Sequence, residues 1–546
     1  MGAAFDSGER HPPPNCFRGT RKELIAKVSE WIDGPCDRRI GWLNGLAGSG
    51  KSAIVQTIAE DYALRKKLAA SFFFSRGILK RSNTTHFFPT IAYQLTISIP
   101  SLKRPIFEVL QDDPTILTKS FRHQVQKLII NPLLTMEEPL SLSMAVVIDA
   151  IDECDDNDLV GEIISLLANA PRITEVPLRF LIACRPERHI RAKMADPIIN
   201  SVTRSFDLSE FSAQDDIRLF LNIRFEDIYN RHYDVMRSIS KPWPSHGSME
   251  SLVMKSSGLF VFASTMLEFI DDEGDNPNRR LETVLNIECR SGELMFAPLD
   301  QLYKEIIYAS SYNDTTRSVV GTITLLFDPL PLDEVEVLIG LRRGDGWLAM
   351  RRLHSIFIVP DDQGKPVLIF HSSLHEFLTN AHRSGEYFVD SPKQHVNITH
   401  FCLELMTKTL KRDVGNMEDP LNLSLGDNRR RKQDAHISGA LQYACRYWAS
   451  HLLLGPSNSD LLNTLHKFGF TSILYWVEAL SLIGALDSAQ ASLQRASEWL
   501  AVGAFPYHFL SVFHLGFLSL LLSRLYPTLL PHPRWISLGY LETLKH

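Results

Sequence analysis

Residues 45–52 read Gly45-Leu46-Ala47-Gly48-Ser49-Gly50-Lys51-Ser52. They fit the pattern G-x-x-x-x-G-K-[ST], in which a glycine-rich loop directs successive backbone N–H groups at the phosphates of a nucleotide. In this pattern Lys51 would neutralise the β- and γ-phosphates, and the Ser52 hydroxyl would ligate Mg²⁺. The stretch therefore predicts a phosphate-binding loop.

The residues on both sides of this loop predict a strand before it and a helix after it. Residues 38–44 become mostly apolar after an arginine pair, and residues 53–62 carry apolar side chains at helical spacing. A helix that begins at the loop turns its N-terminus toward the phosphates. This strand–loop–helix order is the context that the motif requires.

A second element is the apolar, β-branched run of residues 144–148, which ends at Asp149. Such a run suits a strand buried on both faces of a parallel sheet. A carboxylate at its carboxyl end would emerge beside the phosphate loop and could hold the metal. Glu153 is the candidate to orient or deprotonate an attacking water, with Asp152 as its neighbour or substitute. The alternative is that residues 152–156 form a solvated acidic turn.

A third apolar run, residues 178–183, leads to Arg185. An arginine at the tip of a strand could reach a γ-phosphate as a planar bidentate donor. The alternative is an ordinary surface arginine.

Five short strands with helical segments between them predict the fold class. Residues 69–74 and 204–208 are the two further strand candidates. Together they indicate an α/β domain with a three-layer parallel sheet, which we place at residues 18–210. Helical spacing then predicts a helical domain over residues 211–297.

The second half of the chain predicts a winged helix and further helices. Residues 355–360 and 365–371 form a hairpin pattern, followed by a capping box from Ser373 to Glu376. We therefore expect a winged-helix domain over residues 298–394 and an all-helical domain over residues 395–500. Winged helices often bind DNA, but this one lacks a basic recognition helix, so we expect internal packing and no nucleic acid.

Composition indicates a globular protein without an affinity for nucleic acid. The 546 residues are 45% hydrophobic and 22% charged, with a formal net charge of −6. Seven scattered cysteines without a C-x-x-C pair argue for reduced thiols, a cytoplasmic location and no zinc site. The basic cluster at residues 429–432 is interpreted as a solvated loop rather than a localisation signal.

The two ends of the chain carry separate expectations. Residues 1–17 are polar and proline-rich, lack the apolar core of a signal peptide, and are expected to be a disordered tail. Residues 501–546 form an apolar tail whose run at 509–522 is shorter than a membrane span and is interrupted by His514. A packed helix is favoured over a membrane segment.

The motifs taken together resemble fungal NACHT-domain proteins. These belong to the STAND class of signalling P-loop NTPases, which is related to innate-immune receptors, and the similarity includes a nephrocystin-3-like N-terminal region. The resemblance covers about residues 16–500 and rests on these segments: Arg18-Gly19-Thr20-Arg21 with Trp31, the phosphate loop, Phe72-Phe73-Phe74-Ser75-Arg76, residues 87–95, Asp149-Ala150-Ile151-Asp152-Glu153-Cys154, Ala183-Cys184-Arg185-Pro186-Glu187, residues 258–265, and Leu441-Gln442-Tyr443-Ala444-Cys445 with Trp448.

The resemblance implies an ATP/ADP site with Mg²⁺ in which Asp149 is the metal-side carboxylate. It further implies that Glu153 is the hydrolytic acid and Arg185 the γ-phosphate sensor. His371 resembles the winged-helix histidine that contacts the ADP β-phosphate in a closed state. The alternative for His371 is an ordinary packed or exposed histidine.

The function implied by the resemblance is a nucleotide-dependent switch. ADP would clamp the winged helix, and exchange for ATP would release it and lead to self-oligomerisation through the nucleotide-binding domain. Slow hydrolysis would reset the switch, with effector or sensor proteins as partners. Because we expect neither an effector domain before the core nor sensor repeats after it, a truncated receptor or regulatory fragment is also considered.

Two other functions are alternatives to this switch. In the first, the protein is an interaction scaffold whose nucleotide is structural and is never hydrolysed. In the second, it is a small-molecule kinase, which is disfavoured because the sequence has no lid or acceptor-site signature.

Overall fold

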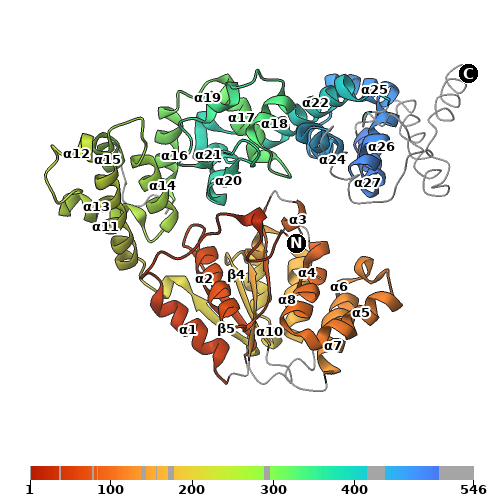
Figure 1. The fold of residues 1–546 in the computed structure, drawn as a ribbon, viewed down its shortest axis with the longest axis horizontal. Helices are drawn as coiled ribbons and strands as arrows, with labels where there is room; N and C mark the ends of the chain where they lie inside the picture. Colours follow the sequence, from red (N-terminus) through yellow and green to blue (C-terminus); the bar gives the residue numbers. More distant parts are fainter. Residues whose placement is uncertain are drawn as a thin grey trace, which may run out of the picture. The chain divides into compact units, whose positions relative to one another are not determined.

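The computed structural model describes residues 2–35, 38–76, 79–82, 84–136, 143–154, 156–169, 178–287, 296–360, 362–412, 414 and 437–502. The basic cluster at 429–432 and nearly all of the apolar tail at 501–546 lie outside these residues. The chain divides into two compact units (Figure 1). The first is Met1–Ile306 with His371–Leu374, and the second is Ile307–Phe370 with His375–His546.

The first unit is built on a five-stranded parallel sheet, which confirms the predicted fold class. Its strands are β1 (Ile40–Asn44), β2 (Leu68–Phe73), β3 (Met144–Asp149), β4 (Leu178–Cys184) and β5 (Thr203–Asp207), in the order β2-β3-β4-β1-β5. All five begin within two residues of the positions that the sequence predicts. β1 has weak strand propensity because of Gly41, and a side chain there would come within 2.6 Å of the Trp31 ring.

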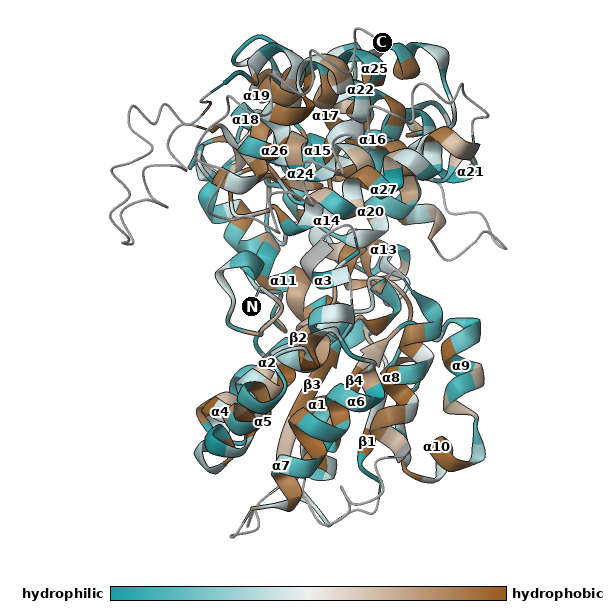
Figure 2. Ribbon diagram, turned by 90° about the vertical axis from the view of Figure 1, so that its right-hand side faces the viewer, coloured by the Kyte–Doolittle hydropathy of each residue, from teal (hydrophilic) through white to brown (hydrophobic). Residues whose placement is uncertain are grey.

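The two faces of the sheet belong to two separate hydrophobic cores. Along β3, Val146 and Ile148 join one core, whereas Ala145 and Val147 join the other. Successive side chains of a strand point to opposite faces, so an uninterrupted apolar run serves both cores. This is why residues 144–148 of β3 are continuously hydrophobic, and the strand is largely brown in Figure 2.

Helices cover both faces. α1 (Lys22–Asp33) and α2 (Lys51–Leu64) contribute to one core. The helices that contribute to the other core are α4 (Phe87–Ser98), α5 (Lys103–Asp112), α6 (Phe121–Val125), a π-helical turn (Gln126–Ile130), α7 (Asn131–Leu134), α8 (Asn157–Asn169), α9 (Arg188–Met194) and α10 (Pro197–Ser201). The short α3 (Leu79–Ser82) follows β2.

Residues 2–16, which we call the N-terminal arm, are folded against the domain, so the expectation of a disordered tail is wrong for them. The backbone N–H of Phe73 donates to Ala3 O at 2.9 Å, and Phe5 N donates to Ser71 Oγ at 3.0 Å. β2 is an edge strand, and an edge presents unpaired backbone groups that favour an added segment. A 3₁₀ turn, Gly8–Arg10, follows and buries Arg10.

The rest of the first unit is helical. It contains α11 (Gln214–Arg231), α12 (Tyr233–Met236), α13 (His246–Ser256), α14 (Phe260–Ile270), α15 (Pro277–Leu285) and the larger part of α16 (Ala297–Ala309). The helices from α11 to α15 occupy the range 211–297, in which the sequence predicts a helical domain.

The second unit contains the predicted hairpin and a series of helices. β6 (Phe357–Ile358) and β7 (Leu368–Ile369) are antiparallel. The helices are α17 (Asp314–Leu325), α18 (Leu332–Ile339), α19 (Asp345–Met350), the larger part of α20 (Ser372–Leu378), α21 (Ala381–Ser384), α22 (Ser391–Thr409), α24 (Gly439–Leu454), α25 (Ser459–Thr471), α26 (Ile473–Leu482) and α27 (Asp487–Val502).

The start of α20 differs from the predicted capping box. The helix begins at Ser372, so Ser373 lies inside its first turn rather than at its cap. His371 takes the capping position, because its Nδ1 accepts the Ser373 backbone N–H at 3.1 Å.

No helix in the described part of the chain is both long enough and apolar enough to cross a membrane.

Candidate nucleotide-binding site

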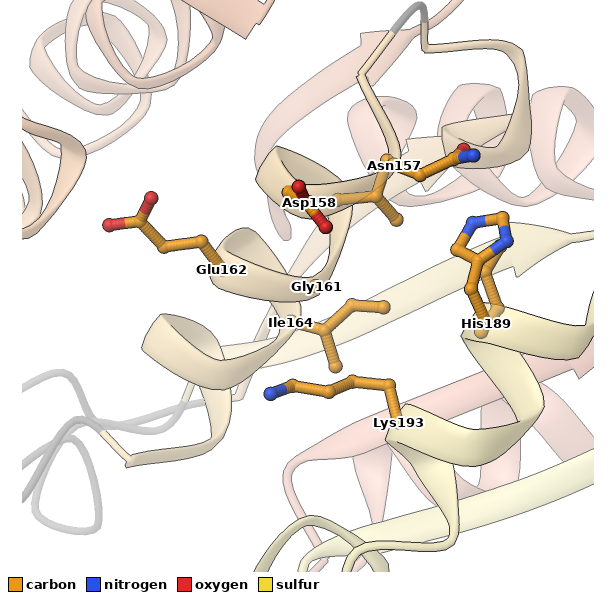
Figure 3. A pocket seen from close by; sticks show the side chains of 9 residues that line it. Asn157, Asp158, Gly161, Glu162, Ile164, His189 and Lys193 are labelled. Atoms are coloured by element: carbon orange, nitrogen blue, oxygen red, sulfur yellow. The ribbon is translucent and has the colours of Figure 1, made fainter.

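A cleft of about 420 Å³ lies between α8 and α9 in the first unit (Figure 3). Its lining mixes both charges, because it includes Asp158 and Glu162 as well as Lys193. None of the residues that the sequence predicts for the site lines it. The predicted residues gather instead at the carboxyl edge of the parallel sheet.

The phosphate loop lies between β1 and α2, and two of its glycines have conformations that other residues rarely adopt. Gly48 has φ +74°, and Gly50, which caps α2, has φ +94°. A side chain at position 48 would also come within 2.3 Å of Val261 Cγ1. The Val261 N–H donates to Gly48 O at 3.2 Å, so the loop rests directly on the first turn of α14.

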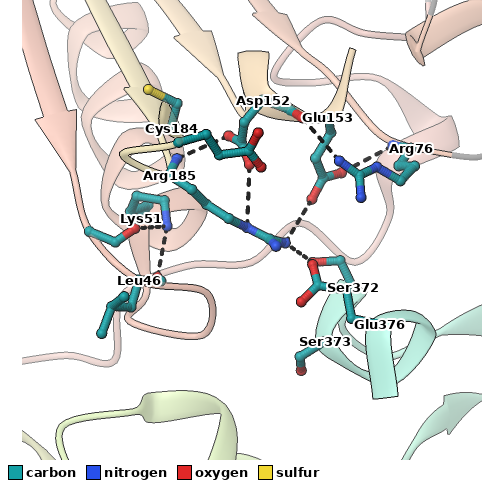
Figure 4. A network of polar contacts seen from close by, with 12 residues as sticks. Leu46, Lys51, Arg76, Asp152, Glu153, Cys184, Arg185, Ser372, Ser373 and Glu376 are labelled. Atoms are coloured by element: carbon teal, nitrogen blue, oxygen red, sulfur yellow. Dashed lines mark hydrogen bonds and ion pairs between the residues drawn. The ribbon is translucent and has the colours of Figure 1, made fainter. Parts of the chain in front are cut away.

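The ammonium group of Lys51 lies within the curve of this loop (Figure 4). Its Nζ donates to Gly45 O at 2.7 Å and to Leu46 O at 2.8 Å. Burial lowers the pKa of Lys51, while the charges of Asp152 and Asp149 raise it. The lysine is therefore positioned where the loop would receive phosphate oxygens.

Asp149 ends β3, two strands away from the phosphate-loop strand, and the residue is 4% exposed. Burial raises the pKa of Asp149 to about 6, while a hydrogen bond from Ser52 and the charges of Arg10 and Lys51 lower it. Its Oδ1 is buried and has no hydrogen-bond partner among the described residues. A buried orphan oxygen beside a hydroxyl is an observation that a bound cation would explain, and both are hard oxygen donors of the kind that Mg²⁺ prefers. Ser52 and Asp149 therefore fit the ion that the motif implies.

The chain turns sharply after Asp149 and brings two acids back over the sheet edge. Ala150 has φ +53°, in the left-handed region, and a 3₁₀ turn, Ile151–Glu153, follows. Asp152 is 3% exposed, so the alternative of a solvated acidic turn is wrong for this residue. Glu153 Oε2 accepts the Arg76 backbone N–H at 3.1 Å. Burial raises the pKa of Glu153 above its ordinary value, which favours a role as proton acceptor near neutral pH.

Arg185 extends from the end of β4, the strand that lies between β1 and β3. Its backbone N–H donates to Asp152 Oδ1 at 3.1 Å, and its Nε lies 3.3 Å from Asp152 Oδ2. Its Nη2 lies 3.8 Å from Glu153 Oε1 and donates to Ser372 Oγ at 3.2 Å (Figure 4). The side chain is only 18% exposed, so it is not an ordinary surface arginine.

His371 belongs to the short segment of the later sequence that forms part of the first unit. Its Nδ1 lies 2.7 Å from Ser373 Oγ, which also contacts the Tyr303 hydroxyl at 2.8 Å. Because Nδ1 accepts a backbone N–H, the neutral ring carries its proton on Nε2. A side chain built at Gly48 would lie 3.9 Å from His371 Cε1, so the imidazole borders the phosphate loop.

These geometries agree with what the chain is similar to. Residues 19–185, which include the phosphate loop and all four predicted polar residues from Asp149 to Arg185, match the family model "Nephrocystin 3, N-terminal". These residues carry a nephrocystin 3 N-terminal domain. The resemblance to NACHT proteins is confirmed by a second match, and the domain is a P-loop NTPase of the NACHT/STAND type, a fold that implies nucleotide binding.

That second match is the vegetative incompatibility protein HET-E-1 of Podospora anserina, which is 22% identical over 510 residues. The match covers 87% of this chain and 35% of the relative, so the chain spans about a third of that protein's length.

Among solved structures, a STAND protein with a tetratricopeptide repeat sensor from Pyrococcus horikoshii has 12% identity and a TM-score of 0.38 over 93% of this chain and 68% of that one. The ORC1 protein of Aeropyrum pernix, solved in complex with DNA, has 12% identity and a TM-score of 0.30 over 66% of this chain and 91% of that one. Likenesses this distant carry no conclusion about function.

The nephrocystin-like domain contains one polar residue at the phosphate loop to which sequence reasoning assigned no role. Arg21 donates from Nη2 to Ser49 O at 2.9 Å and from its backbone N–H to Asp216 Oδ2 at 3.0 Å, and its guanidinium lies over the Phe260 ring at 5.1 Å. Its Nε and Nη1 are buried and have no hydrogen-bond partner among the described residues. The only sequence signal was its place in a motif that carries the resemblance, because its partners are distant along the chain.

Proposed function

We propose that this protein is an ATP/ADP-dependent signalling switch, in which nucleotide exchange drives opening and oligomerisation and slow ATP hydrolysis resets the closed state. One observation carries the proposal. Arg185 contacts both candidate catalytic acids and also Ser372, which follows the histidine beside the phosphate loop. Arg185, which would contact the γ-phosphate, therefore also contacts the segment His371–Leu374.

The nucleotide would be held first through its phosphates. The N–H groups of Gly45–Ser52 and the Lys51 ammonium supply donors and positive charge at one place. Ser52 and Asp149 would hold Mg²⁺, which when bound neutralises charge on the β- and γ-phosphate oxygens.

Hydrolysis would use the two acids behind the loop. Glu153 would accept a proton from water as the water oxygen bonds to the γ-phosphorus, and the bond to the β,γ-bridging oxygen would break toward ADP. Asp152 holds Arg185 through its backbone and side chain, so its role would be to orient that arginine. Because Glu153 also receives the Arg76 N–H, slow turnover is expected.

The switch would act through competition for Arg185. In the described structure Arg185 donates to a neutral hydroxyl, Ser372 Oγ. A γ-phosphate is a stronger, bidentate acceptor for a guanidinium. ATP would therefore draw Arg185 from Ser372 and loosen His371–Leu374, whereas ADP would leave that contact in place and offer its β-phosphate to His371. A ligand shifts a two-state equilibrium through such differential contacts.

The proposed consequence of opening is self-oligomerisation through the nucleotide-binding domain, with effector or sensor proteins as further partners. The name of the P. anserina relative refers to vegetative incompatibility, a signalling response that supports this proposal. Release into a larger assembly is also a common result of interface rearrangement in switching proteins.

A second candidate function is a scaffold whose nucleotide is bound and never hydrolysed. The ion pair of Arg185 with Glu153, at 3.8 Å, favours this candidate because it occupies the acid that would receive the proton of water.

Glu153→Gln separates the two functions. The switch predicts that this variant retains ATP, loses phosphate release and accumulates as the higher-mass species, measured by a phosphate assay and by light scattering. Glu162→Gln on α8 is the matched control, because that carboxylate lies outside the site. Wild-type protein that binds ATP without any phosphate release, and with the same mass as the ADP form, would establish the scaffold instead.

A further inference from the structure

The N-terminal arm runs along the helix that begins at the phosphate loop. Cys16 N donates to Thr57 Oγ1 at 3.0 Å, and Asn15 Nδ2 donates to Glu60 Oε1 at 3.2 Å. Earlier in the arm, Arg10 reaches Gln56 of the same helix, α2. The arm is thus fixed to the element whose N-terminus faces the phosphates.

Arg10 is the buried centre of this arm. Its side chain makes three hydrogen bonds, one of them to Ala4 O at 3.4 Å, and one cation–π contact, although the residue is only 8% exposed. Nη1 donates to Gln56 Oε1 at 2.8 Å and to Phe5 O at 2.9 Å, and the guanidinium lies 3.6 Å from the centroid of the Phe73 ring. Burial lowers the pKa of Arg10 to about 10, so the side chain remains a cation at neutral pH.

The two groups that Arg10 joins lie next to the two candidate metal ligands. Gln56 is one turn after Ser52 on α2, and residues four apart lie on the same face of a helix. Phe73 is the register partner of Asp149 in the parallel pairing of β2 and β3. One guanidinium therefore links the helix that carries the hydroxyl with the strand that pairs beside the carboxylate.

Charge supports the same arrangement. Arg10 acts on Asp149 as an attractive cation within a buried environment. A second arginine, Arg81, donates from Nε to Phe73 O at 3.0 Å and also acts on Asp149 and Glu153. The acidic edge of the sheet is thus backed by two cations, one of which comes from the arm.

We propose that Arg10 is a positioning residue for the magnesium–nucleotide site: it sets the spacing of Ser52 and Asp149 and makes the N-terminal arm part of that site. The inference rests on the proposed binding of Mg²⁺ and nucleotide. By linkage, a magnesium–nucleotide complex that depends on Arg10 also holds the arm against the domain.

The first test compares Arg10→Met and Arg10→Lys in the full chain. The probe is a fluorescent ATP analogue, titrated with excess Mg²⁺ and again with EDTA. Residues that support metal ligands typically contribute about 10–100-fold to metal affinity. Arg10→Met is expected to lose affinity in this range with Mg²⁺ and to change little in EDTA. Arg10→Lys keeps the charge and is expected to recover part of the loss.

The matched control is Arg104→Met, which removes an exposed arginine from α5. Equal losses with Mg²⁺ and with EDTA, or no loss at all in Arg10→Met, would overturn the inference while leaving nucleotide binding itself established. Wild-type protein that binds the analogue under neither condition would overturn the proposed function as well.

A second measurement needs no variant and therefore does not depend on whether Arg10→Met folds. Arg10 is a site for trypsin, and cleavage after it requires the arm to leave the domain. Mg²⁺ with ATP is expected to slow this cleavage in wild-type protein more than ATP with EDTA does. Equal cleavage rates would contradict the inference.

Discussion

Each of the two units buries a polar cluster, and the clusters differ in how completely their groups are paired. In the second unit, Phe327 N donates to the Tyr443 hydroxyl at 3.0 Å, which lies 2.7 Å from His451 Nε2. His451 Nδ1 in turn lies 2.8 Å from His395 Nδ1. A single assignment of protons, from Phe327 through Tyr443 and His451 to His395, gives each of these groups a partner.

The cluster at the sheet edge is not closed in this way. Asp149 Oδ1 and two nitrogens of Arg21 are buried without a hydrogen-bond partner among the described residues, and Ala150 has a left-handed backbone. Buried polar groups are normally paired, and strain gathers at functional sites. The difference indicates that the histidine cluster satisfies its own polar groups, whereas the sheet edge leaves buried groups that a bound ligand would pair. Five predictions test this contrast.

Lys51→Ala is expected to have the largest effect. Removing the cation from the loop should weaken ATP binding by on the order of 100-fold or more, because charge-assisted contacts to phosphate are lost. The unfolding free energy should change little. Isothermal titration and thermal unfolding measure the two quantities, with the exposed Lys103→Ala as control. Unchanged affinity in a folded sample would remove the basis of the site.

His451→Phe is expected to show the opposite pattern. It keeps an aromatic ring but leaves the Tyr443 O–H without its acceptor and His395 Nδ1 without its partner, which should lower the unfolding free energy of the second unit by about 2–3 kcal/mol. ATP affinity should be unchanged. A His395→Phe/His451→Phe double variant should recover part of the loss, because the buried His395 nitrogen that lacks a partner is then also removed.

The pair of His395 and His451 also predicts how the stability of the second unit changes with pH. Burial lowers the pKa of His395 to about 4 and that of His451 well below its ordinary value. The pKa of each histidine is lower in the folded state than in the unfolded state, where it is near 6.5. Their contribution to stability is therefore fully present above pH 6.5 and is lost as pH falls from 6.5 toward 4. His451→Phe should therefore lose less stability on acidification than wild type. A steeper loss would contradict the pairing.

Asp149→Asn is expected to stabilise the nucleotide-free protein and to weaken its binding of magnesium–nucleotide. Burial raises the pKa of Asp149 from 3.8 to about 6, so the ionised carboxylate destabilises the fold, fully above pH 6 and not at all below about pH 4. At pH 7 the variant should gain about 1–2 kcal/mol, and the gain should vanish toward pH 4. Denaturant unfolding across this pH range checks the sign. A variant less stable than wild type at pH 7 would mean that the carboxylate is structural.

Ser372→Ala should have the smallest effect. It removes one hydrogen bond to Arg185, which contributes about 0.5–1.5 kcal/mol. The expected result is a several-fold faster release of ADP, measured by stopped-flow with a fluorescent ADP analogue, and a loss of unfolding free energy no larger than this contribution. Ser373→Ala is a contrasting variant, because it breaks the contacts to His371 and Tyr303 instead.

The sequence predicted the sheet well because its signals are local. The apolar runs at residues 144–148 and 178–183 are strands because both of their faces are buried, and the phosphate loop is recognisable from eight consecutive residues. Asp149, Asp152, Glu153 and Arg185 converge because parallel strands end at one edge.

The contacts that sequence reasoning missed are non-local or depend on one atom. Arg10 lies in a polar, proline-rich stretch, and nothing in its neighbours indicates that Gln56 and Phe73 bury it. Arg21 contacts Ser49, Asp216 and Phe260, which are far apart along the chain. The capping pattern at Ser373 was wrong because the imidazole of His371 accepts the N–H that a serine would usually take.

The contact between Gly48 and Val261 has a mechanical consequence. Since Gly48 has no side chain and its carbonyl is bound by the Val261 N–H, the phosphate loop and the start of α14 cannot be displaced independently. A side chain added at position 48 would displace the start of α14 from the loop. A bound phosphate that changes the conformation of the loop would therefore also shift the start of α14. The position of this helix would then depend on whether the loop is occupied, without direct contact between the helix and the ligand.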